Sequence, residues 1–289
     1  MIKTILVPVS GNETDAACFA AALPLARAFA AHIDALHVRV DPLEIAMTMS
    51  TEGAGGLLLQ GIIDDLTRDA NANEAKARSR FADLCAKETI PLGTTPASAS
   101  AKPSAEWHVE TGQEARWMAA YGMTADLVLA PRGVAGQDAV ARSTLEALLL
   151  ETGRPLLIPG SAPSSPRLAA RIAIAWKATP QASRAVACAM PLLTRAKEVV
   201  VLTVEEEEGR RDDANRLVAY FGWHGIAATI ERLSPGPHGA AETMLAGAAT
   251  RAELLVMGGY GHTRLREWVF GGFTQRVLND APLPVLIAH

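Results

Sequence analysis

The chain has 289 residues, of which 49% are hydrophobic and 20% charged, and its formal net charge is −4 at pH 7. This length predicts two domains, and the composition is that of a packed globular protein. The negative charge excludes a general electrostatic attraction to nucleic acid or anionic lipid. The three cysteines, Cys18, Cys85 and Cys188, lie far apart without CxxC spacing, which argues against a disulfide framework or a zinc site.

The first residues have the composition of a strand and do not form a basic segment followed by a long apolar run. No later stretch approaches the roughly 18 uninterrupted apolar residues of a membrane-spanning helix. We therefore expect a cytoplasmic protein with neither a secretion signal nor a membrane span.

Strands and helices alternate from the N-terminus, and the same order occurs twice. In the first half strands are predicted at residues 2–9, 35–40, 107–110, 126–130 and 154–159, with a helix at 14–31. In the second half strands are predicted at residues 171–176, 198–204, 228–232, 253–257 and 283–288, with a helix at 180–194. Strands that alternate with helices and are apolar on both faces predict a parallel sheet covered on both sides. The predicted fold is α/β, with two tandem doubly wound domains, each a mainly parallel five-stranded sheet flanked by helices.

A short polar, proline-rich stretch at residues 161–166 is the predicted joint, which gives domains of residues 1–162 and 167–289. The halves differ between their second and third strands, where the first half carries an insertion at residues 43–106 with helical spacing at 64–87. Loops of that length usually contain structure or function, and a plain surface insertion is favoured over a ligand lid. A small-ligand enzyme or carrier would need a closed apolar pocket near residues 43–90.

Glycines follow the fourth strand of the second half in a G-x2-G-x9-G spacing, at Gly258, Gly261 and Gly271. The first two let the backbone leave the strand in conformations closed to other residues. Gly271 and Gly272 open a helix whose free amides can face an anion, with Thr274 as the nearest hydroxyl. Ligands of open α/β sheets bind at this carboxyl edge. The stretch therefore predicts a phosphate-binding loop.

Three stretches of the chain resemble the universal stress protein family: Ile5-Leu-Val-Pro-Val-Ser-Gly11, the glycine loop, and Ala281-Pro-Leu-Pro-Val-Leu-Ile287. The resemblance implies a Rossmann-like fold of the adenine nucleotide alpha hydrolase type, which binds an adenine nucleotide and serves stress responses. Such proteins are often dimeric through their last strands, and tandem members can pair their two halves in the same way. A monomer with an internal pseudo-dimer and a homodimer both stay open.

The chain departs from this family's pattern at four positions. The acidic residue expected after the first strand is Ser10 in the first half and Lys177 in the second. Gly272 stands where the family has Ser or Thr. In the first half Pro131 replaces the first loop glycine, and because proline has no amide hydrogen the first half is predicted to have lost the site.

Three charged or aromatic residues of the second half have two interpretations each. His262 and Lys177 can contact phosphate through charge-assisted bonds, or they are solvated surface residues. Trp176 can stack on a base or pack in the core. The histidines show no HxH, HExxH or Cys/His grouping, so no metal site is predicted. Nor is there a motif of a dedicated enzyme, although slow ATP hydrolysis by positioning alone stays open.

The sequence thus predicts a stress-response protein that binds ATP or a related adenine nucleotide without dedicated catalysis. The residues expected to contact it are Gly258, Gly261, His262, Gly271, Gly272, Thr274 and Lys177. The alternative is a nucleotide-free tandem universal stress protein that acts by contacts with protein partners, which the sequence does not identify.

Overall fold

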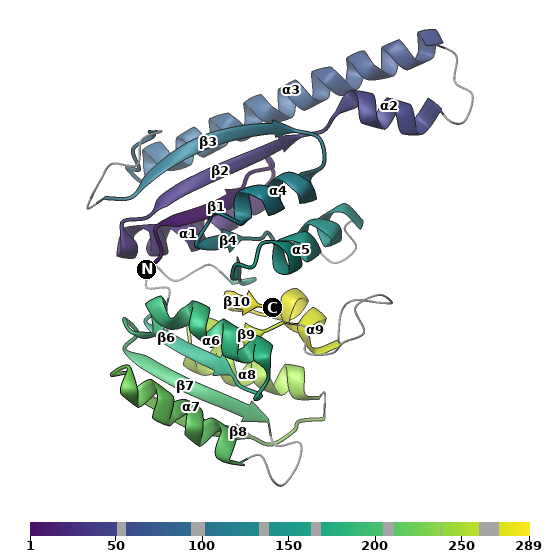
Figure 1. Cartoon of the computed structure of the whole chain (residues 1–289). Coiled ribbons are helices and arrows are strands. Elements are labelled where there is room, and N and C mark those ends of the chain that lie inside the picture. The colour runs from purple at the N-terminus through teal and green to yellow at the C-terminus, as the bar shows by residue number, and fades with distance from the viewer. Residues whose placement is uncertain are drawn as a thin grey trace.

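The computed structural model describes residues 1–50, 56–93, 102–132, 139–162, 169–204, 211–237, 239–259 and 272–289. Strands and helices alternate along these segments (Figure 1). The strands are β1 (Thr4–Pro8), β2 (His32–Arg39), β3 (Ser104–Thr111), β4 (Leu127–Leu129), β5 (Leu156–Ile158), β6 (Arg171–Ala175), β7 (Glu198–Val204), β8 (Ala228–Leu233), β9 (Leu254–Gly258) and β10 (Val285–Ala288). The helices are α1 (Thr14–Phe29), α2 (Pro42–Ser50), α3 (Gly56–Lys87), α4 (Glu114–Gly122), α5 (Ala139–Glu151), α6 (Pro180–Leu193), α7 (Arg211–Trp223), α8 (Ala240–Arg251) and α9 (Gly272–Asp280).

The ten strands form one sheet in the order β3-β2-β1-β4-β5-β10-β9-β6-β7-β8. Neighbouring strands within β1–β5 and within β6–β10 are parallel, whereas β5 and β10 are antiparallel, with Leu157 opposite Leu286. Figure 1 shows β10 at the junction of the halves. The α/β class is confirmed, and the halves pair through their last strands inside one chain.

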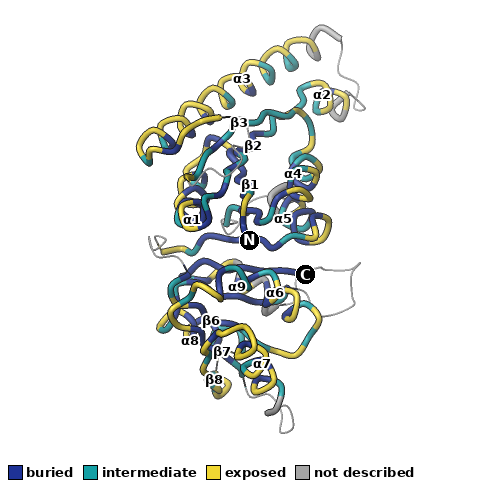
Figure 2. The backbone as a smooth tube through the Cα atoms, turned by 60° about the vertical axis from the view of Figure 1, so that its left-hand side comes forward, coloured by how far each residue is buried: buried dark blue, intermediate teal, exposed yellow. Residues whose placement is uncertain are grey.

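Helices cover both faces of the sheet, and a hydrophobic core lies on each side. The first core cluster contains Phe19 of α1, Phe81 of α3 and Phe221 of α7. The second contains Met118 of α4 and Val277 of α9. Figure 2 shows the buried strands between helices whose outer surfaces are exposed. The result is a three-layer arrangement, as expected of strands that are apolar on both faces.

The insertion of the first half is mainly helical. The helix predicted at residues 64–87 is α3, which begins earlier, at Gly56, and α2 was not predicted. Ala77, Phe81 and Cys85 form a buried stripe along α3 at a spacing of four residues. This stripe belongs to the same core cluster as α1, so this part of the insertion covers the sheet as a structural layer.

Strands β2 and β3 begin three residues earlier than predicted. Their first residues alternate in burial, because Ile33, Ala35 and Ala105 are fully buried while Asp34 and Glu106 on the other face are only partly so. Polar residues on that face interrupt the apolar run by which the strands were recognised. None of the helices in the described segments is long and apolar enough to cross a membrane. Residues 163–166 of the predicted joint at 161–166 lie outside the described residues, so the domain boundary stays a prediction.

Candidate functional site

The carboxyl edge of the second half brings together two of the predicted nucleotide contacts. Gly258 ends β9, and Lys177 follows β6, the neighbouring strand, in which Ala175 pairs with Met257. Lys177 is exposed, whereas Thr274 in the first turn of α9 is buried. The structure thus places Gly258 and Lys177 at the same edge of the sheet.

Gly261, His262 and Gly271 are outside the described residues, and Gly272 is described only as the first residue of α9.

Gly258 is needed for a different reason from the one predicted. Its φ is not positive, so the expectation of a backbone conformation closed to other residues is wrong at this position. A Cβ atom here would lie 2.4 Å from the Ala182 nitrogen and 2.6 Å from the Gln181 carbonyl carbon. Glycine therefore lets the N-terminus of α6 pack directly against the end of β9.

The N-terminus of α6 is held in place by a side-chain cap. The Ala182 amide donates a hydrogen bond to Thr179 Oγ1 at 3.2 Å, and Pro180 occupies the first helical position. The loop between β6 and α6 is consequently short and fixed. Its residues Trp176 and Ala178 form one end of a cavity.

That cavity has a volume of about 390 Å³ and lies between α6 and α7 at the end of β6. Its lining consists of Trp176, Ala178, Ser183, Val186, Ala187, Asp213, Arg216, Leu217 and Tyr220. The indole Nε1 of Trp176 is buried and has no hydrogen-bond partner among the described residues, which is unusual for a buried donor. The cavity therefore combines apolar walls with a donor that a ligand or water can satisfy.

Sequence reasoning named only Trp176 among the lining residues. The contribution of α7 was missed because no helix was predicted there. The spacing of Ala214, Leu217 and Phe221, which are buried, is the signal that would have revealed this helix.

The first half has a cavity at the corresponding place, but its volume is only about 10 Å³. Val9, Phe19, Arg80, Phe81 and Leu84 are among the residues that line it. The rings of Phe19 and Phe81 pack edge to face, with centroids 6.0 Å apart and an interplanar angle of 84°. A void of this size is too small for an organic ligand. The cavity beside α3 thus gives no support to a ligand pocket near residues 43–90.

The backbone amides of the loop after β1 are already hydrogen-bonded, because a carboxylate of the same chain accepts from them. Asp15, which is buried, accepts hydrogen bonds from the amides of Ser10 at 2.9 Å and Gly11 at 2.6 Å. Arg80 of α3 donates to the Gly11 carbonyl oxygen at 2.6 Å. Ile5 of β1 corresponds to Ile172 of β6 in the strand pairing, and ten residues further on Ala182 corresponds to Asp15. Helix α6 has no acidic residue, so no carboxylate from α6 occupies this place.

Pro131 and Arg132 occupy the first-half counterpart of the glycine-loop start. Leu127 pairs with Ile5 as Leu254 pairs with Ile172, which aligns Pro131 with Gly258. The neighbouring Arg132 donates to the carbonyl oxygens of Pro159 at 3.2 Å, of Asn279 at 3.0 Å and of Ala281.

Two of the carbonyls bound by Arg132 belong to the C-terminal end of α9, where a positive charge is favourable. Burial lowers the pKa of the Arg132 guanidinium, while the negative charge of Asp280 raises it. Arg132, which follows β4, therefore links the first half to the second.

Comparison with known proteins adds to this geometry. The model of the universal stress protein family matches residues 154–289. The second half of the chain belongs to the universal stress protein family. The resemblance inferred from the sequence motifs is thereby confirmed, and a universal stress protein domain accounts for all strands from β5 onward.

Solved structures of universal stress proteins extend the likeness to both halves. A universal stress protein from Archaeoglobus fulgidus DSM 4304 is similar with a TM-score of 0.70 and 16% identity, over 99% of this chain and 95% of that one. A putative universal stress protein from Pseudomonas aeruginosa UCBPP-PA14 has a TM-score of 0.56 and 15% identity, over 99% and 93%. At this identity the likeness shows the fold. The comparison with curated proteins gave no match.

Membership of this family supports a role in the stress response. Universal stress proteins are generally cytoplasmic and non-catalytic.

Proposed function

We propose that the chain is a cytoplasmic stress-response protein that binds ATP or a related adenine nucleotide in its second half, without dedicated catalysis. The observation that carries this proposal is the contrast between two equivalent places. The cavity beside Trp176 has about 390 Å³, while its first-half counterpart has about 10 Å³. A volume above roughly 300 Å³ is typical of small-molecule sites.

The nucleoside occupies the cavity in this proposal. Val186 and Leu217 offer apolar walls, and the indole ring of Trp176 offers an aromatic surface for a base. The unpartnered Nε1–H of Trp176 supplies a hydrogen bond that an acceptor on the ligand completes. No carboxylate follows β6, so the ribose is not held as in the family's usual pattern.

The phosphates lie along the carboxyl edge beside Gly258 and Lys177. Lys177 is exposed at this edge and supplies positive charge, and His262 is proposed to add to it. Backbone amides around Gly261, Gly271 and Gly272 at the start of α9 supply donors to the phosphate oxygens. Thr274 is buried in the first turn of α9, so we assign it a smaller part than the amides.

The proposal is tested by identifying what the protein carries. Freshly purified protein is denatured, and the released small molecules are separated by chromatography and identified by mass spectrometry. We expect ATP or ADP in near-stoichiometric amount, and its loss in Gly261→Asp, which places a negative charge in the loop. A blank, followed by no saturable binding at millimolar nucleotide, would contradict the proposal.

That blank would favour the second candidate, a nucleotide-free universal stress protein that acts through protein contacts. The observation behind it is the pair of residues Ser10 and Lys177, which replace carboxylates in the two halves. Because β5 and β10 already pair within the chain, we propose a monomer with an internal pseudo-dimer. Light scattering coupled to gel filtration distinguishes a 30.5 kDa monomer from a homodimer.

A further inference from the structure

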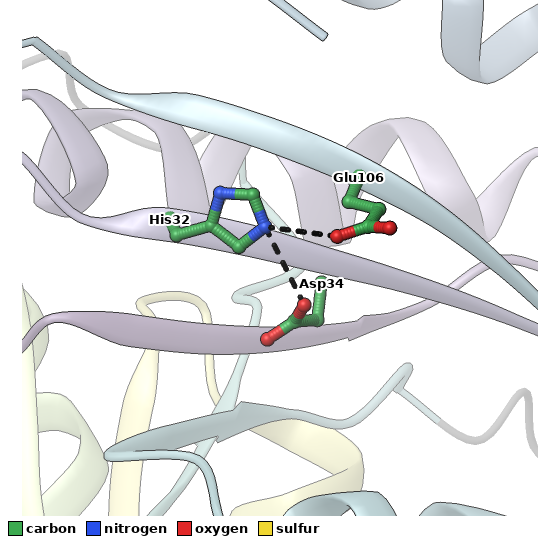
Figure 3. A group of neighbouring side chains, drawn as sticks. All are labelled: His32, Asp34 and Glu106. Carbon is green, nitrogen blue, oxygen red and sulfur yellow. Dashed lines mark ion pairs between the residues drawn. The ribbon is translucent and has the colours of Figure 1, made fainter. Parts of the chain in front are cut away.

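A group of imidazole and carboxylate side chains lies on the sheet of the first half, away from the cavity. His32 and Asp34 are two residues apart on β2, and Glu106 lies beside Asp34 on the neighbouring strand β3. Side chains two residues apart on a strand share a face of the sheet. Figure 3 shows the three side chains turned toward one another across the two strands.

The distances within this group are slightly longer than those between the ligands of a single metal ion. His32 Nε2 lies 3.5 Å from Asp34 Oδ1 and 3.9 Å from Glu106 Oε2. One ligand atom from each residue lies within 4.8 Å of the others. A tetrahedral ion with bonds of about 2.0–2.1 Å places its ligand atoms about 3.3 Å apart. The side chains must therefore move closer together, His32 and Glu106 by roughly 0.6 Å, to meet that geometry.

We propose that His32 Nε2, Asp34 and Glu106 bind one divalent transition-metal ion, of which Zn²⁺ is the best match to a nitrogen and two carboxylate oxygens. The two carboxylates balance the charge of the ion, and the neutral imidazole completes a three-residue set. The three side chains are about a quarter exposed, at 24%, 27% and 24%. A water molecule can therefore reach the remaining coordination position.

Neighbouring groups orient two of the proposed ligands. His32 Nδ1 lies 2.8 Å from Ser104 Oγ. When Nδ1 carries the proton and donates to this hydroxyl, the lone pair of Nε2 faces the carboxylates, which is the arrangement a metal requires. His108 Nε2 lies 3.1 Å from Asp34 Oδ1 and can donate a hydrogen bond to it. We therefore assign Ser104 and His108 as positioning residues.

The second half has no such group at the equivalent positions. There Val200 pairs with Thr229, where the first half pairs Asp34 with Glu106. One ion per chain is therefore expected. No linear motif in the sequence predicts this site, because its ligands come from alternate residues of two strands that are far apart in sequence.

The test uses the full, untagged chain after treatment with a chelator and removal of that chelator. Zn²⁺ is titrated by calorimetry and in competition with a chromophoric chelator, and Co²⁺ binding is followed by its visible absorption. We expect saturation near one ion per chain. Glu106→Gln and Asp34→Asn, which keep the side-chain shape, should each weaken binding at least tenfold. His224→Gln, which removes an exposed histidine elsewhere, should leave the affinity unchanged.

A positioning role makes a separate prediction. His108→Gln should weaken Zn²⁺ binding by about tenfold while the Co²⁺ spectrum keeps its shape, because the first ligands are retained. Circular dichroism of each variant checks that it is folded, and Glu106→Gln decides the question if Asp34→Asn is not. Absence of saturable Zn²⁺ binding, or equal affinity in a folded Glu106→Gln variant, would overturn the proposal and leave an ion-pair cluster only.

Discussion

The two halves of this chain share an order of strands and helices but differ in how the space at the end of the first strand is filled. In the first half Phe19 and Phe81 fill it, and about 10 Å³ remains. In the second half Val186 and Leu217 line the corresponding place, and about 390 Å³ remains. A few side-chain volumes therefore decide whether this fold has room for a ligand, while the backbone plan is unchanged.

The carboxyl ends of β4 and β9, which occupy equivalent places in the two halves, also differ. Gly258 lets α6 approach β9 closely, whereas the first half has Pro131 there, followed by Arg132, which binds carbonyls of the other half. At its carboxyl edge the first half thus contacts the second half through Arg132. At the equivalent edge of the second half we place the proposed nucleotide site.

The sharpest test of this contrast is a methyl group at Gly258. Gly258→Ala places Cβ within 2.4 Å of the α6 backbone, so either strand or helix must move. We expect a loss of roughly 3 kcal/mol in the free energy of unfolding. Gly61→Ala is the matched control, because Gly61 lies in α3 with nothing within 4 Å of its added Cβ. This change should stabilise by about 0.5–1 kcal/mol, and chemical denaturation measures both.

Arg132→Met tests the cohesion between the halves and should have an intermediate effect. It removes three donated hydrogen bonds and leaves the carbonyl oxygens of Pro159, Asn279 and Ala281 without this partner. We expect a loss of roughly 2 kcal/mol. Arg68→Met, whose side chain is 73% exposed, should change stability by no more than about 0.5 kcal/mol. Equal denaturation midpoints for the two variants would show that Arg132 does not join the halves.

The smallest effect concerns the closed core of the first half. Burial, with a further contribution from Asp15, raises the pKa of the Cys18 thiol from 9.0 to about 12. Above pH 9 the unfolded chain loses this proton and the folded chain keeps it, so stability falls as the pH rises toward 12. Between pH 8 and pH 9.5 we expect Cys18 to account for a loss of about 1 kcal/mol. In Cys18→Ala the free energy of unfolding should fall by about 1 kcal/mol less between pH 8 and pH 9.5. An unchanged dependence on pH would contradict the claim that the Cys18 thiol is buried in the core of the first half.

The strands and the repeat were predictable because short β-branched runs such as β1 and β6 are a local signal. Pairing of the halves through their last strands was a possibility implied only by the family resemblance, and its antiparallel direction was not predicted, since nothing in Leu156–Ile158 specifies its partner. The cavity could not be predicted, because it depends on the relative sizes of residues such as Val186 and Leu217 on separate helices. The group around His32 was missed because parallel pairing, not sequence distance, brings Glu106 beside Asp34.

The measurement that tests the central claim most directly is a calorimetric titration of ATP into three proteins: the unmodified chain, Val186→Phe and Val40→Phe. Val186→Phe gives the second-half cavity the side chain that Phe19 supplies in the first half. Val40 is 51% exposed, so Val40→Phe adds the same group away from the cavity.

We predict saturable binding to the unmodified chain, equal affinity for Val40→Phe, and binding at least about tenfold weaker for Val186→Phe, equivalent to about 1.4 kcal/mol. Thermal unfolding checks that Val186→Phe is folded. Equal affinity in all three proteins, or no saturable binding to the unmodified chain, would contradict the claim that the open cavity makes the second half the nucleotide-binding half.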